Sequence, residues 1–106
     1  MNIECYMRKG YRAEYQAKKE LIQKYGAENI LKVAIGGAVD FLVIRPDSNK
    51  IEKIVEVKEC HKNKFYPTPR EKMQFERLEE LGKKHSIETE LWIKHPRNDF
   101  IKKRLV

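Results

Sequence analysis

Gly-Gly-Ala-Val-Asp-Phe-Leu-Val-Ile at residues 36–44 and Ile-Val-Glu-Val-Lys at residues 54–58 decide the fold of this 106-residue chain. Both runs are apolar and rich in β-branched or aromatic residues, a composition typical of β-strands. Residues 45–50 between them contain proline, aspartate, serine and asparagine, which favour turns. We therefore expect two antiparallel neighbours that bring Asp40 of the first strand close to Glu56 of the second.

Charged residues interrupt these two apolar runs. Because side chains alternate along a strand, Glu56 and Lys58 are expected on one face, with Val55 and Val57 on the other. Both faces of the Asp40 strand also look buried, and a buried charge requires a partner. Two carboxylates suit a hard divalent cation such as Mg²⁺ or Mn²⁺, and a lysine beside them suits phosphodiester hydrolysis.

A helix is predicted upstream of the strands, over residues 9–25, and Gly26 suits its C-terminal end. On a helical wheel Glu14 falls inside the apolar arc, which makes it a third candidate inward-facing acid. The alternative is that Glu14 pairs with Lys18 one helical turn later. The apolar residues that define the arc are Tyr11, Tyr15, Leu21, Ile22 and Tyr25.

Asp40 followed by Glu56-Val57-Lys58, between two predicted helices, resembles the PD-(D/E)XK nuclease superfamily. Lys9-Gly10 ahead of Glu14 is similar to the opening of the archaeal Holliday junction resolvases of that superfamily. The basic and aromatic residues 62–66, the helix residues 74–78 and a last strand at 91–94 continue the likeness, which spans most of residues 8–95.

The resemblance implies a metal-dependent endonuclease and a set of site residues. Lys58 would orient or activate the attacking water, Gln74 would steady Lys58 or the phosphate, and Glu14 would ligate a second ion or hold a metal-bound water. The expected products carry a 5′ phosphate and a 3′ hydroxyl. The implied catalytic residues are Glu14, Asp40, Glu56, Lys58 and Gln74, and the implied ligands of Mg²⁺ or Mn²⁺ are Asp40, Glu56, Glu14 and the Val57 carbonyl.

The composition favours a polyanionic partner. The net charge is +7 and the pI is near 9.4, so phosphate contacts with counterion release are expected. Phe65 and Tyr66 are candidates for base stacking or for anchoring the loop in the core. The residues expected to bind DNA are Arg8, Lys9, Arg12, Lys62, Lys64 and Tyr66, which flank the proposed site in the sequence.

The predicted order is a helix at 9–25, strands at 29–35, 38–45 and 51–59, a helix at 70–84 and a strand at 88–95. This is a restriction-endonuclease-like α/β fold with an αβββαβ core, a mixed sheet of about four strands flanked by helices. Thr68 and Glu71 have the spacing of a capping box before the second helix. One domain is expected over residues 1–106, with a core at 8–95 and a short basic tail at 96–106 that would contact DNA, serve as a dimer arm or fray.

The preferred function is hydrolysis of branched or junction DNA, for which two symmetric cuts favour a homodimer. The alternatives are a nuclease of the same fold that acts on flaps, nicks or single strands, and a DNA-binding module without turnover. The charges also have a structural interpretation, in which Asp40 pairs with Lys58 and Glu56 faces solvent on an edge strand. The sequence shows neither a signal peptide nor a long apolar span, and Cys5 and Cys60 do not form a zinc set, so an intracellular protein without membrane contact is expected.

Overall fold

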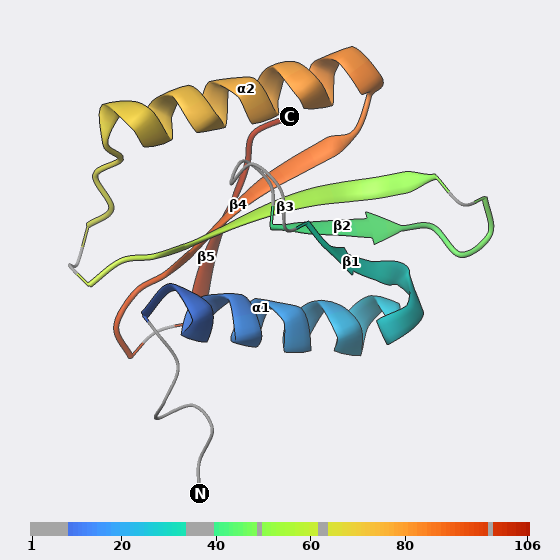
Figure 1. The fold of residues 1–106 in the computed structure, drawn as a ribbon, viewed down its shortest axis with the longest axis horizontal. Coiled ribbons are helices and arrows are strands. Elements are labelled where there is room, and N and C mark those ends of the chain that lie inside the picture. The colour runs from blue at the N-terminus through green and yellow to red at the C-terminus, as the bar shows by residue number, and fades with distance from the viewer. Residues whose placement is uncertain (1–8, 34–39, 49, 62–63, 98) are drawn as a thin grey trace, which may run out of the picture.

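A single five-stranded sheet lies between two helices (Figure 1). The computed structural model describes residues 9–33, 40–48, 50–61, 64–97 and 99–106. The strand order is β1-β2-β3-β4-β5; β3 and β4 are parallel and the other neighbours antiparallel. The elements are α1 (Lys9–Tyr25), the short 3-10 helix η2 (Ala27–Asn29), β1 (Ile30–Lys32), β2 (Phe41–Ile44), β3 (Ile51–Glu59), α2 (Pro69–His85), β4 (Glu88–Lys94) and β5 (Phe100–Arg104).

Helix α1 covers one face of the sheet through a narrow stripe of small and apolar residues. Ala13, Ala17 and Leu21 recur every four residues and are almost fully buried. They belong to a core cluster with Phe41, Val43, Val55, Val57 and Trp92 of the sheet. The predicted alternation of Val55 and Val57 with Glu56 and Lys58 is therefore confirmed, because the valines pack against α1 while Lys58 contacts Gln74 of α2.

Helix α2 covers the opposite face, where Leu91 and Ile93 of β4 form a second cluster with Cys60. Phe65 and Phe75 pack against this cluster, so the core interpretation of Phe65 is confirmed. The helix begins with the predicted capping box. The Thr68 hydroxyl accepts from the Glu71 backbone N–H at 3.1 Å, and the Glu71 carboxylate accepts from the Thr68 N–H at 2.9 Å.

The end of the chain differs from the sequence expectation. Residues 96–106 were predicted as a basic tail, yet Phe100–Arg104 form the edge strand β5, paired antiparallel with β4. The run of cations at 102–104 masks the strand pattern, because basic side chains are tolerated on an exposed edge. Phe100 packs on Trp92 with ring centroids 5.4 Å apart, and the Lys102 ammonium lies 4.2 Å from the Trp92 ring centroid.

The other boundaries shift by small amounts. The first two strands are shorter than predicted, although residues 34–35 and 38–39 of those predictions lie outside the described residues. Strand β3 has the predicted bounds, and α2 extends the predicted helix by one residue at each end. Within the described part of the chain, no helix combines the length and apolar character needed to cross a membrane.

Gly82 should resist replacement by alanine, although alanine is the better helix former by about 1 kcal/mol. A Cβ at this buried position would lie 2.8 Å from the Ile87 carbonyl oxygen and 2.8 Å from Thr89 Cγ2. We expect Gly82→Ala to lower the free energy of unfolding by about 1 to 3 kcal/mol, measured by urea denaturation. The exposed Lys83→Ala is the control, and a Gly82→Ala variant as stable as the wild type would contradict the close packing.

Candidate active site

Asp40 and Glu56 lie together at the centre of the sheet, as the hairpin prediction required. Phe41 pairs with Val55, and the Asp40 N–H donates to the Val55 carbonyl at 3.2 Å. The Val57 N–H in turn donates to Asp40 Oδ2 at 2.6 Å, which ties the Asp40 carboxylate to the strand that carries Glu56. Glu56 is 2% exposed on a central strand, so the interpretation of a solvent-facing edge residue is wrong.

The surroundings of this carboxylate pair favour protonation. Burial raises the pKa of Glu56 to about 9, and the neighbouring Asp40 charge adds to the increase. Burial also raises the pKa of Asp40, the Glu14 charge acts in the same direction, and the hydrogen bond from the Val57 N–H opposes the shift. At neutral pH the two carboxyl groups therefore retain a proton unless a cation replaces it.

The donor set fits a hard divalent cation. Glu56 Oε2 is buried and has no hydrogen-bond partner, which leaves a carboxylate oxygen free to bind an ion. Asp40 contributes a second carboxylate, and oxygen donors are those that Mg²⁺ and Mn²⁺ prefer. Among the described residues no three His, Cys, Asp or Glu side chains form a metal cluster, so a cation at Asp40 and Glu56 would need further ligands from the backbone or water.

Glu14 reaches the site region from α1. Its Oε2 lies 3.0 Å from Nζ of Lys32 on β1, so its ion pair is with Lys32 and the alternative pairing with Lys18 is wrong. Its negative charge contributes to the raised pKa of Asp40. Glu14 thus places a third negative charge near Asp40 and Glu56, and its ion pair with Lys32 links α1 to β1.

Lys58 is held between β3 and α2. Its Nζ donates to Gln74 Oε1 at 3.3 Å and lies 3.6 Å from Glu56 Oε1 and 3.8 Å from Glu71 Oε2. The ion pair with Asp40 that the structural interpretation required is replaced by these contacts with Glu56 and Glu71. The sequence indicated Glu71 as a helix cap and missed its contact with Lys58, although Glu71 and Gln74 are one turn apart on the same helix.

The residues expected to bind DNA are less fully described. Arg8 and Lys62 lie outside the described residues, as does the side chain of Lys9. Arg12 and Lys64 are exposed, and Tyr66 is 72% exposed, so the anchoring alternative for Tyr66 is wrong. These side chains are accessible to a large ligand, and their contact with DNA stays a prediction.

Comparison with known proteins confirms the fold. The chain is similar to the solved structure of Hjc, a Holliday junction resolvase from the archaeal hyperthermophile Archaeoglobus fulgidus, with a TM-score of 0.66 and 20% sequence identity. The similarity covers 92% of this chain and 74% of that chain. Neither a family model nor a curated protein matches the sequence. The chain therefore has the restriction-endonuclease-like fold and resembles the archaeal resolvases, as the arrangement of Asp40 and Glu56-Val57-Lys58 indicated.

The raised pKa of Glu56 predicts how stability varies with pH. The folded protein keeps a proton on Glu56 that the unfolded chain loses above pH 4.5. The contribution of Glu56 to the free energy of unfolding is therefore complete below pH 4.5 and is lost as the pH rises through about 9. Glutamine is neutral throughout this range. We expect Glu56→Gln to remove a decline of more than about 1 kcal/mol in unfolding free energy between about pH 5 and pH 9.

The measurement is urea unfolding at several pH values with a chelator present. The exposed Glu28→Gln is the control and should follow the wild type. Parallel curves for Glu56→Gln and wild type would show that the Glu56 carboxyl titrates alike in the folded and unfolded chain.

Proposed function

We propose that this protein is a divalent-metal-dependent endonuclease that hydrolyses phosphodiester bonds in branched or junction DNA. One observation carries the proposal: the buried Glu56 and the half-buried Asp40 form a carboxyl pair beside the tethered ammonium of Lys58. A purely structural role would leave Glu56 Oε2 buried without a partner, which costs free energy. A protein that only binds DNA gains nothing from carboxylates next to a phosphate, because they repel it.

Asp40 and Glu56, with the Val57 carbonyl, would hold Mg²⁺ or Mn²⁺. Such an ion supplies positive charge for the scissile phosphate and lowers the pKa of a bound water. Binding requires that the Asp40 and Glu56 pair give up its proton, so the occupied site is favoured by rising pH. Glu14 would hold a water or a second ion on the α1 side of the pair.

Lys58 would position and activate the attacking water. Gln74 accepts a hydrogen bond from its Nζ at 3.3 Å, and Glu71 lies on the other side at 3.8 Å, so the ammonium has a defined position beside Glu56. Gln74 is therefore a positioning residue for Lys58. The capping box fixes the start of α2, and it places both of these side chains over β3.

The preference for branched DNA is supported by the fold and the charge. The solved structure to which this chain is similar is a Holliday junction resolvase, and the net charge of +7 favours a ligand with many phosphates. Resolving a junction requires two symmetric cuts, and one chain supplies one site. We therefore propose that the active form on a junction is a homodimer.

The test is cleavage of a labelled panel that contains a four-way junction, a flap, a splayed duplex, a single strand and a linear duplex. With Mg²⁺ or Mn²⁺ we expect one branched substrate to be cut preferentially, leaving 5′ phosphate and 3′ hydroxyl ends. Asp40→Ala and Lys58→Ala should each reduce the rate at least about 100-fold. Lys50→Ala, an exposed lysine in the turn before β3, should leave the rate unchanged.

A different result would overturn the catalytic assignment. Tight, salt-sensitive binding of the same panel without cutting under either metal would leave a DNA-binding module on a nuclease fold. Preferential cutting of the flap or the single strand would support the nuclease activity, and that DNA form would replace the junction as the proposed substrate.

A further inference from the structure

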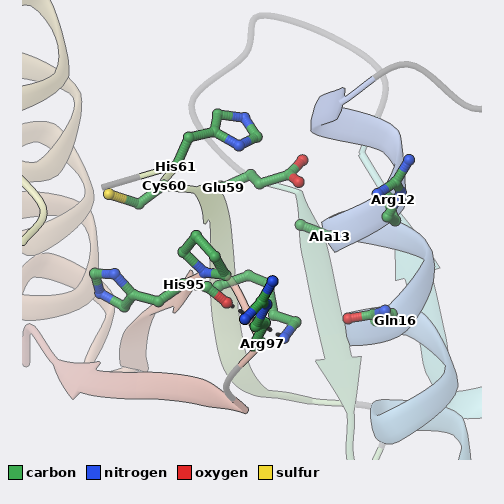
Figure 2. A pocket seen from close by; sticks show the side chains of 10 residues that line it. Arg12, Ala13, Gln16, Glu59, Cys60, His61, His95 and Arg97 are labelled. Atoms are coloured by element: carbon green, nitrogen blue, oxygen red, sulfur yellow. Dashed lines mark hydrogen bonds between the residues drawn. The ribbon is translucent and has the colours of Figure 1, made fainter. Parts of the chain in front are cut away.

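A cavity of about 440 Å³ opens on the α1 side of the sheet, at the carboxyl ends of the parallel strands β3 and β4 (Figure 2). Its volume lies in the range of sites that take small organic ligands. Three segments far apart in the sequence meet there. The lining residues are Arg12, Ala13 and Gln16 of α1, Glu59, Cys60 and His61 at the end of β3, and Lys94, His95, Pro96 and Arg97 at the end of β4.

The lining combines several cationic groups with one buried acceptor. Arg12, Lys94 and Arg97 carry positive charge, and among the described residues that line the cavity only Glu59 carries a carboxylate. Glu59 Oε2 is buried and has no hydrogen-bond partner. Figure 2 shows the Glu59 carboxylate, the Gln16 amide and the Arg97 guanidinium around the same space. Such a site matches a ligand that has an anionic group and an N–H donor.

The backbone of Arg97 adds a second observation. Its φ is 62°, in the left-handed region that favours glycine and costs other residues about 1 kcal/mol. The turn between β4 and β5 thus places an arginine where a glycine would be less strained. The arginine side chain lines the cavity, so we infer that the strained backbone is retained for the position of this side chain.

The cavity and the candidate active site draw residues from the same two elements, α1 and β3. On β3 the alternation of side chains sends Glu56 and Lys58 toward the α2 side and Glu59 toward α1. On α1 Glu14 points toward Lys32 of β1, whereas Arg12 and Gln16 face the cavity. Because Glu59 lies three residues beyond Glu56 on β3, about 10 Å along the strand, a DNA strand with its scissile phosphate at Asp40 and Glu56 would pass near the end of the sheet where the cavity lies.

We propose, building on the proposed nuclease function, that this cavity binds one unpaired nucleotide of the DNA substrate. The phosphate contacts the guanidinium groups of Arg97 and Arg12, whose planar donors suit phosphate oxygens. The base donates from an exocyclic amino group to Glu59. Cytosine, adenine and guanine carry such a group, whereas thymine offers only its ring N3–H, so the cavity favours the three bases with an amino group over thymine.

The experiment is an NMR titration of the ¹⁵N-labelled full chain with each of the four deoxyribonucleoside 5′-monophosphates, without divalent metal. We expect shifts at residues that line the cavity, with dTMP the weakest ligand by at least about threefold. Glu59→Ala, which removes the acceptor, should abolish that difference. Arg97→Gly, which suits the left-handed backbone, should weaken all four nucleotides by about tenfold. Arg45→Ala, in the turn at the other end of β3, removes the same charge and should change neither.

The outcomes separate this proposal from the nuclease assignment, because the titration requires no cleavage. Chemical shift changes that avoid the cavity would overturn the nucleotide site. So would nucleotide affinities that Arg97→Gly and Glu59→Ala leave unchanged. If the protein cuts no DNA yet shows the expected chemical shift changes, the nucleotide site stands and the nuclease assignment is wrong.

Discussion

The pairing of a buried and a half-buried carboxyl group on one β-hairpin is the constraint on which the rest of the structure depends. Asp40 and Glu56 are held together by the antiparallel pairing of β2 with β3 and by the hydrogen bond from the Val57 N–H to Asp40. Burial works against the charge of both groups, and the pKa of Glu56 rises to about 9. Such an arrangement is costly for a metal-free protein, and the proposed cation would offset this cost by replacing the proton.

The two helices hold the site from opposite faces. Helix α1 lies close to the sheet because Ala13 and Ala17 present little bulk, and this approach brings Glu14 to Lys32 and the Asp40 region. Helix α2 begins at a capping box, and its first two turns place Glu71 and Gln74 around Lys58. The alternation of β3 places Val55 and Val57 toward α1 and Glu56 and Lys58 toward α2.

Local pattern made the centre of the fold predictable. Strict alternation assigned the faces of β3, and turn formers between two apolar runs indicated the hairpin that joins Asp40 to Glu56. The capping residues Thr68 and Glu71 located the start of α2. Each of these features is determined by neighbours in the sequence, and so is the motif on which the resemblance to the resolvases was based.

Features that depend on distant segments were missed. Strand β5 carries cations at 102–104, and its pairing with β4 and the packing of Phe100 on Trp92 are visible only in three dimensions. The ion pair of Glu14 with Lys32 joins a helix to a strand, which a helical wheel does not show. The cavity that contains Glu59 and Arg97 is built from three separate segments, so no spacing in the sequence indicates it.

The most direct test of the central claim is Mn²⁺ binding to the full chain. Calorimetry measures the binding, and the increase in melting temperature measures the stabilisation. We predict that wild type binds Mn²⁺ and is stabilised by it, and that Asp40→Asn and Glu56→Gln each lose the binding while remaining folded. Undiminished Mn²⁺ binding in both variants would contradict the account, because the carboxyl pair would then serve the fold alone.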